Sequence, residues 1–356
     1  DHTAQGAPAT QDELYTYDER NRLTKMERGT LAGTPYGSIT SKKREENWTV
    51  GGTTLDDVGN WTTYLTKKDV GGNLTTETDH DRAHDGENEI TGMTQTTGTW
   101  AVPDYDEHGN TLAAPKGGAV GTRLFFKYDA WGRLVQVYSD SGTGPDEVIE
   151  EYRYDGLNRR IRKMRPGESN WAVEEFYYNA GWQLLETREG TASRTGTPLS
   201  EPALVTGLKY QYVWSLRYID APVLRDEDVD SDGNAREYST DDERLYYLTD
   251  ANMNVTTLTD HNGDATERVR YDPYGRPTFL DGSWANASST SGEDNAILFA
   301  GYYHDADESG LYHVRHRYLH PELGRWMSRD RIGYQDGMNL YQYARSQPTR
   351  FRDPLG

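Results

Sequence analysis

A short unit built around a Tyr-Asp pair recurs along the chain and constrains its fold more than any other feature. Each copy contains an aromatic strand, the pair itself, a Gly or Asn two or three residues later, usually a basic residue, and a second apolar strand. The copies are Tyr17-Asp18, Tyr105-Asp106, Tyr128-Asp129, Tyr154-Asp155, Tyr178-Asn179 and Tyr271-Asp272, with degenerate forms at Asp57 and Asp250. Three successive intervals from Asp106 are 23, 26 and 24 residues long. Such a regular period indicates a repeat architecture.

The copy RLFFKYDAWGRLVQVY shows how one unit folds. Arg123 to Tyr128 and Leu134 to Tyr138 are rich in aromatic and β-branched residues, which favours strands. Between them, Asp129 can accept hydrogen bonds from the amides ahead of it, and Gly132 can adopt a positive φ without steric cost. Each unit is therefore predicted to be one β-hairpin. Because a single hairpin cannot bury its own face, many hairpins must share a sheet.

The composition favours an all-β fold class. Only 34% of the residues are hydrophobic, and 26 are Tyr against 6 Phe. Tyrosine combines a large apolar face with a hydroxyl that tolerates water, so it suits sheets with one wet face. Residues 328–343 form the one stretch where a short helix is expected. Five polar stretches are predicted to be long exposed loops: residues 29–41, 67–89, 139–145, 189–202 and 281–294.

The net charge of −20 limits the partners that the chain can have. Nucleic acids and anionic membranes are polyanions, so neither is expected to bind. No apolar run approaches the 18 residues that a membrane span needs, so no membrane insertion is predicted. The absence of cysteine removes disulfides, thiol catalysis and thiolate metal sites from consideration.

One acidic stretch has the spacing of a calcium-binding loop. Asp228, Asp230 and Asp232 alternate along the chain, and Gly233 permits the sharp turn that such a loop requires. The twelfth position is Ser239 instead of a bidentate Glu, and no helices are expected to flank the loop. The alternative is a solvated acidic hairpin loop. Calcium is the only cofactor for which the sequence offers a candidate site.

Four histidines crowd the C-terminal region: His304, His313, His316 and His320. Alternate residues on a strand share a face, which places His316 and His313 on opposite faces. We therefore expect packing and ring stacking here instead of metal binding.

The last 47 residues read GLYHVRHRYLHPELGRWMSRDRIGYQDGMNLYQYARSQPTRFRDPLG. This segment resembles the Rhs-associated core of the Rhs/YD-repeat proteins, whose pattern is close to GLYYYRARYYSPELGRFLSRDPIG, followed by NLYxY and DPxG. The matching positions include Pro321-Glu322-Leu323-Gly324-Arg325 and Asp353-Pro354-Leu355-Gly356. The Tyr-Asp hairpins extend the resemblance over nearly the whole chain.

The resemblance implies a spiral strip of hairpins that forms a shell or barrel-like sheet, as in teneurin-like shells and the C components of Tc toxins. It implies a hairpin region over residues 1–297 and a core domain over residues 298–356. The function implied is structural: the C-terminal part of a larger secreted or cell-surface protein that encloses or presents a polymorphic C-terminal toxin. One alternative is an extracellular filament or adhesion module assembled edge to edge. A second is a single-turnover, aspartate-dependent self-protease.

The self-protease alternative has candidate residues. Asp330 falls on the aspartate of the family's Asp-Pro-Ile-Gly, which is thought to act with a second carboxylate in self-cleaving members, with the cut just beyond DPxG. Asp336 and Asp353 are the candidate partners, and the sequence does not choose between them. The chain departs from the pattern where Arg331 replaces the proline and where residues 344–348 replace Asn-x-Pro. The cation of Arg331 would oppose proton sharing by Asp330.

The ends of the sequence fit a processed piece. The chain begins at Asp1 without a methionine and ends directly after DPxG, so we expect processing or a natural terminus next to the core. The repeats predict roughly 26 strands spaced about 4.8 Å apart, a strip too short to enclose cargo alone. The expected partners are the rest of a precursor or further copies of the chain, together with a C-terminal toxin.

Overall fold

The computed structural model describes residues 11–33, 37–97, 99–168, 170–193, 207–235, 243–306 and 309–356. Strands make up 53% of the described residues and helix 4%, which confirms the all-β prediction. By their contacts, the residues divide into two compact units. Unit 1 comprises Asp1–Arg123, Asp272–Arg276 and Leu319–Asp353, and unit 2 comprises Leu124–Tyr271, Pro277–Tyr318 and Pro354–Gly356. The boundary expected between residues 297 and 298 stays a prediction, because this division follows contacts and not the motif.

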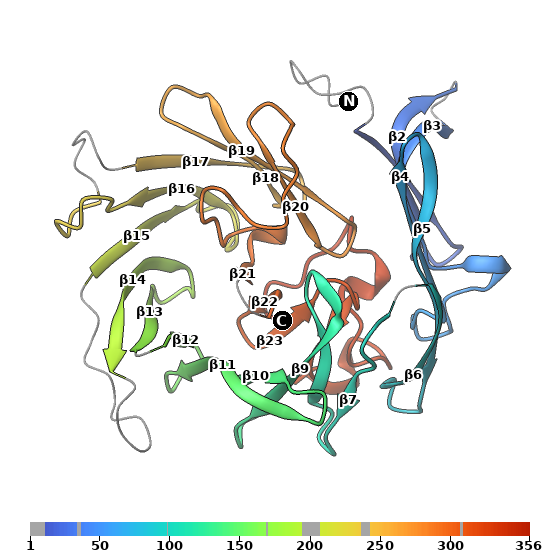
Figure 1. Ribbon diagram of the computed structural model, residues 1–356, viewed down its shortest axis with the longest axis horizontal. Coiled ribbons are helices and arrows are strands. Elements are labelled where there is room, and N and C mark those ends of the chain that lie inside the picture. Colours follow the sequence, from blue (N-terminus) through green and yellow to red (C-terminus); the bar gives the residue numbers. More distant parts are fainter. Residues whose placement is uncertain are drawn as a thin grey trace. The chain divides into compact units, whose positions relative to one another are not determined.

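In unit 1, six strands pair in chain order to form an antiparallel sheet (Figure 1). Two short pairs, β7 with β8 and the end of β23 with β24, complete the strands of this unit. The strands that begin in unit 1 are β1 (Asp12–Tyr17), β2 (Leu23–Ala32), β3 (Ser38–Asn47), β4 (Thr63–Val70), β5 (Asn73–His84), β6 (Ile90–Thr97), β7 (Asp104–Tyr105), β8 (Thr111–Lys116), β9 (Ala119–Tyr128) and β24 (Arg325–Trp326). Its 3₁₀ turns are η1 (Val50–Gly52), η3 (Gly333–Gln335) and η4 (Ala344–Ser346). The short helix expected in residues 328–343 is thus the single turn η3.

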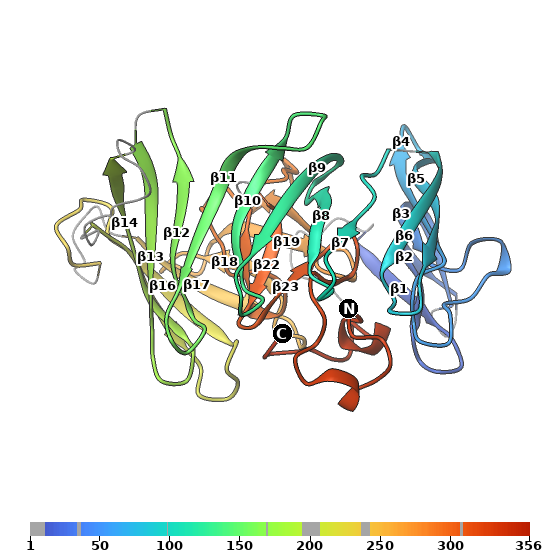
Figure 2. The same ribbon diagram turned by 90° about the horizontal axis from the view of Figure 1, so that it is seen from below.

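In unit 2, the strands from β9 to β20 also pair in chain order, and every pair is antiparallel. The order is linear and ends at β20, so the sheet is open and not a closed barrel. Figures 1 and 2 show this sheet curving around β21 and β22. The strands are β10 (Leu134–Asp140), β11 (Pro145–Tyr154), β12 (Arg160–Pro166), β13 (Asn170–Tyr178), β14 (Leu184–Ser193), β15 (Gly207–Trp214), β16 (Pro222–Glu227), β17 (Glu243–Thr249), β18 (Val255–Thr259), β19 (Ala265–Tyr271), β20 (Pro277–Asp281), β21 (Tyr303–Asp305), β22 (Leu311–Val314) and β23 (Arg317–His320), with the 3₁₀ turn η2 (Phe299–Gly301).

The aspartate of each Tyr-Asp pair organises the hairpin turn. One carboxylate oxygen of Asp129 accepts the amides of Trp131 and Arg133, at 2.9 and 3.1 Å, and the other accepts Nε of Arg133 at 2.7 Å. Partial burial raises the pKa of Asp129, but these hydrogen bonds outweigh burial and hold it below its usual range. The Arg133 guanidinium also donates to the carbonyl of Asp155 in the next turn on the same side. Equivalent bonds occur at Asp18 with Arg22 and at Asp155 with Arg159. At Asn179, Oδ1 accepts the amide of Gln183, and Nδ2 donates to Oε1 of Gln183.

In three of the pairs, the tyrosine hydroxyl ties its strand to the preceding hairpin. The hydroxyl of Tyr154 donates to the carbonyl of Leu134 at 2.6 Å, and that of Tyr178 donates to the carbonyl of Arg160 at 3.0 Å. Tyr271 makes the same bond to Val255 at 2.7 Å. In each case the accepting carbonyl belongs to the residue five positions after the aspartate of the preceding turn, which is Asp129, Asp155 or Asp250. In these three pairs the tyrosine therefore serves as a cross-strand donor, a function that the composition did not predict.

Three sequence expectations about turns and loops are wrong. The turn of the second hairpin in unit 1 is built on Asp56, whose carboxylate accepts the amides of Val58 and Asn60, while Asp57 pairs with exposed Arg20. Residues 29–41 lie largely in β2 and β3, and residues 67–89 lie largely in β4 and β5. These hairpins carry Thr, Lys and Glu in place of aromatic residues, so their strands lack the apolar signal. Residues 282–294 lie outside the strands, as expected.

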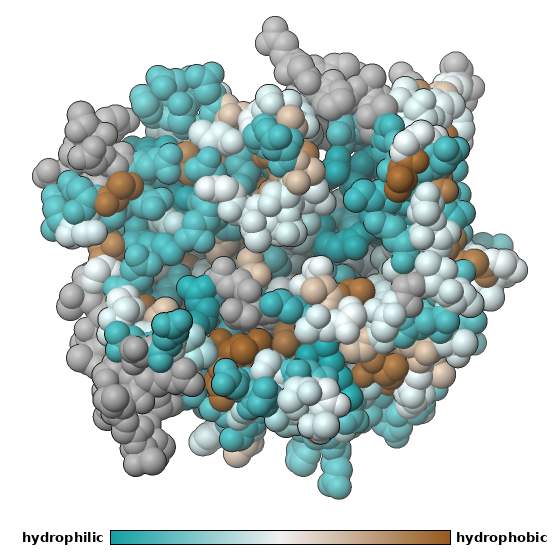
Figure 3. Space-filling view, in the orientation of Figure 1, coloured by the Kyte–Doolittle hydropathy of each residue, from teal (hydrophilic) through white to brown (hydrophobic). Residues whose placement is uncertain are grey.

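The core of unit 2 is mainly aromatic and aliphatic. One cluster of buried residues consists of Phe176, Leu184, Tyr210, Tyr212, Leu245, Tyr247, Val255, Leu258 and Ile297. Hydrophilic colours dominate the face shown in Figure 3, outside the grey residues. No helix among the described residues is long and apolar enough to cross a membrane.

Candidate functional site

The last three residues of the chain are bound to the turn between β22 and β23. The Arg315 guanidinium donates to the carbonyl of Pro354, and the amide of His316 donates to the carbonyl of Leu355 at 3.3 Å. Gly356 has a φ of +73°, and a Cβ placed on it would lie 2.1 Å from the carbonyl oxygen of Val314. This turn therefore holds the backbone of three successive residues and leaves no room for a side chain at position 356.

Arg315 is fixed by a buried ion pair. Its guanidinium contacts both carboxylate oxygens of Asp220, with Nη2–Oδ1 and Nη1–Oδ2 distances of 2.5 and 3.1 Å. The two side chains are only 9% and 7% exposed. Asp220 lies in the loop between β15 and β16, where Gly301 packs directly on its carbonyl. Arg315 and Val314 also line a cleft of about 60 Å³, whose walls include Trp182, Trp214 and His313.

The three aspartates proposed for self-cleavage all lie in unit 1. Asp330 follows β24, and its half-buried carboxylate accepts the amide of Ile332 at 2.9 Å. Asp336 follows η3, is exposed, and forms an ion pair with Arg345. Asp353 is half-buried and directly precedes the bound tripeptide. These positions do not decide whether Asp336 or Asp353 is the partner of Asp330.

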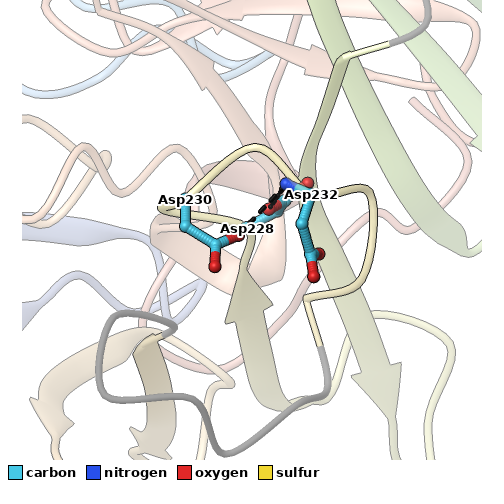
Figure 4. Close-up of side chains that lie close together, drawn as sticks. All are labelled: Asp228, Asp230 and Asp232. Carbon is cyan, nitrogen blue, oxygen red and sulfur yellow. Dashed lines mark hydrogen bonds between the residues drawn. The ribbon is translucent and has the colours of Figure 1, made fainter.

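The acidic loop brings its three carboxylates close together. Asp228, Asp230 and Asp232 each offer a carboxylate oxygen, and the three atoms lie within 4.8 Å of one another (Figure 4). The two oxygens of Asp228 accept the amides of Asp232 and Gly233, at 3.1 and 2.9 Å, which curls the loop. Carboxylate oxygens at these separations fit the oxygen shell of calcium. The twelfth position, Ser239, lies outside the described residues.

Two of the four crowded histidines pack against tyrosine rings, and a third, His316, packs edge-on against Trp182. His304 lies 4.6 Å from the ring of Tyr312, and His313 lies 5.1 Å from that of Tyr318. Burial lowers the pKa of His304 to about 4, and it also lowers that of His313. These rings are neutral packing elements.

Sequence reasoning missed a buried ionic cluster in unit 2. Asp305 is fully buried and accepts hydrogen bonds from Arg160 and Lys163, at 2.5 and 3.1 Å. Burial raises the pKa of Asp305, but the two cations outweigh it and hold the pKa well below its usual range. The cluster joins β12 to β21, about 140 residues apart. No local sequence pattern predicts that Asp305 pairs with residues so far away in the sequence.

The chain is similar to stretches of bacterial toxin proteins. It is 32% identical to toxin protein Tse5 of Pseudomonas aeruginosa, over 71% of this chain and 18% of that protein. It is 29% identical to double-stranded DNA deaminase toxin A of Burkholderia cenocepacia, over 71% of this chain and 16% of that protein. It is 26% identical to the tRNA3(Ser)-specific nuclease WapA of Bacillus spizizenii, over 90% of this chain and 12% of that protein. The chain therefore spans less than a fifth of the length of each.

No family model matches the chain. Among solved structures, the crystal structure of TcdB2-TccC3-TEV superimposes with a TM-score of 0.47 at 17% identity, over 99% of this chain and 21% of that one. At the sequence level, the chain is therefore similar to segments of several toxin proteins.

Proposed function

We propose that the chain is part of a β-hairpin shell that houses or presents a toxin segment following Gly356, within a larger secreted or cell-surface protein. In this proposal residues 1–297 build the wall and residues 298–356 close it. Unit 2 has the form that a wall requires, because successive hairpins are bonded to one another through Tyr hydroxyls and Arg guanidinium groups. Such a strip can lengthen by adding units without a new core.

One observation carries the proposal. A deaminase toxin and a tRNA nuclease have different activities by name, yet their matches cover 71% and 90% of this chain and so overlap over more than half of it. A segment shared by proteins that act on different substrates is better suited to a common structural task than to either reaction.

An activity assay tests whether this chain has a structural function instead of either enzymatic activity. The isolated chain is expected neither to deaminate double-stranded DNA nor to cleave tRNA, under conditions in which the two relatives do so. Turnover of either substrate by the chain alone would refute the structural assignment.

Self-cleavage after Gly356 is a second proposed function, favoured by the bound tripeptide. Asp330, with Asp336 or Asp353, would activate a water molecule. The water oxygen bonds to the carbonyl carbon of Gly356, the C–N bond to the next residue breaks, and a proton passes to the leaving amine. In a chain extended past Gly356, Asp330→Asn should abolish cleavage. An equal rate in that variant would remove Asp330 from the reaction.

A further inference from the structure

We infer that Arg315 and the β22–β23 turn form a clamp that binds the backbone of Pro354–Gly356 and positions the peptide bond after Gly356. Its role in cleavage rests on the self-cleavage proposed above. The binding of the tripeptide itself does not depend on that reaction.

The clamp contacts account for the last two positions of the D-P-x-G pattern. The carbonyls of Pro354 and Leu355 are both taken by donors from the turn, so their backbone is fixed. The Leu355 side chain is 59% exposed, which leaves that position free to vary. At Gly356, the positive φ and the 2.1 Å approach of a Cβ to Val314 admit only glycine. Recognition therefore depends on the backbone and on the absence of one side chain.

The clamp is rigid before the tripeptide binds, because Asp220 holds the guanidinium in place. A bidentate Arg–carboxylate pair fixes the plane of the guanidinium and leaves Nη1 directed at the carbonyl of Pro354. Arg315 also adopts a φ of +47°, a conformation that is unfavourable for a residue with a Cβ. The fold thus maintains a strained residue at the position from which its side chain reaches both partners.

Carboxypeptidase digestion tests the clamp on the 356-residue chain itself. Release of Leu355 should accelerate about tenfold or more in Arg315→Met, which is the effect of losing one charge-assisted hydrogen bond. Gly356→Ala alters only the chain end and should accelerate release without affecting folding. Arg315→Lys should lie between wild type and Arg315→Met, and Arg217→Met, on the exposed side of the same loop as Asp220, should match wild type. Unchanged release in both Arg315→Met and Gly356→Ala would overturn the clamp.

Cleavage of an extended chain tests its role in positioning. Arg315→Met and Gly356→Ala should slow cleavage while leaving the shape of its pH profile unchanged, and Arg315→Lys should restore part of the rate. A shifted pH profile, or an unchanged rate in both variants, would contradict a positioning role. If the parent extended chain is not cut, the self-cleavage proposal fails, and the carboxypeptidase result still decides whether the clamp exists.

Discussion

At the scale of single residues, the turn aspartates are expected to contribute more to stability than ordinary surface carboxylates. Asp155 accepts two amides and the Nε of Arg159. Hydrogen bonds to a charged group are worth roughly 1.5–3 kcal/mol, so Asp155→Ala should lower the free energy of unfolding by about 2–3 kcal/mol in urea titrations. Asp155→Asn keeps an oxygen that can accept the two amides, so it should lower the free energy of unfolding by less. Asn179 accepts the corresponding two amides in its own turn.

Asp140→Ala is the matched control for this measurement. Asp140, the last residue of β10, also borders a hairpin turn of unit 2 and accepts the amide of Gly142 without a guanidinium partner. Equal losses in Asp140→Ala and Asp155→Ala would show that the Arg159 pair adds nothing.

The buried histidines predict a loss of stability on mild acidification. The pKa of His304 is about 4 in the folded chain because the ring is buried, against about 6.5 when unfolded. Between these values only the unfolded state takes up the proton, so stability is full above pH 6.5 and falls as the pH drops toward 4. This residue contributes up to about 3 kcal/mol of that fall. His304→Phe should retain the stack on Tyr312 and flatten the dependence, as measured by urea unfolding at pH 7, 5.5 and 4.5. Parallel curves for the two proteins would exclude the mechanism.

Sequence reasoning located the turn residues but not the bonds that join distant residues. The Tyr-Asp pairs predicted the hairpins, because a turn is determined by residues that are close together in the sequence. The Asp220–Arg315 pair joins residues 95 apart, and the hydrogen bonds made by the tyrosine hydroxyls depend on register, so neither could be inferred from spacing alone.

At the scale of elements, the acidic loop predicts a calcium effect. If Asp228, Asp230 and Asp232 hold the ion, added calcium should raise the melting temperature and chelator should lower it, because a ligand that binds only the folded state stabilises it. Asp230→Asn should abolish the shift, whereas Asp264→Asn, in another exposed turn, should retain it. The absence of a shift in a calcium titration would favour the solvated loop.

Strands were predicted well where aromatic residues mark them and poorly where they do not. Units such as β9–β10 follow the aromatic pattern. The hairpin β4–β5 pairs threonines and charged residues around Gly71 and Gly72. Because these residues are polar, the sequence predicted a loop there. Backbone hydrogen bonds to the neighbouring strands outweigh the weak propensity of such a segment.

At the scale of the whole molecule, the open strand orders predict association. In unit 1 the order ends at β1 and β6, and in unit 2 it ends at β20, whose outer edge is partly covered by a bridge between Phe279 and Ser288. Strand edges present unpaired amides and carbonyls that can pair with other strands. Light scattering on the isolated chain should give masses above 40.4 kDa that rise with concentration. A stable monomer over a wide concentration range would contradict the need for partners and the filament alternative with it.

Limited proteolysis of the full gene product tests the central claim most directly. If these hairpins house the segment that follows Gly356, that segment should resist protease under native conditions and become sensitive only when the sheet unfolds. Rapid digestion of that segment while the hairpins remain intact would contradict a housing function.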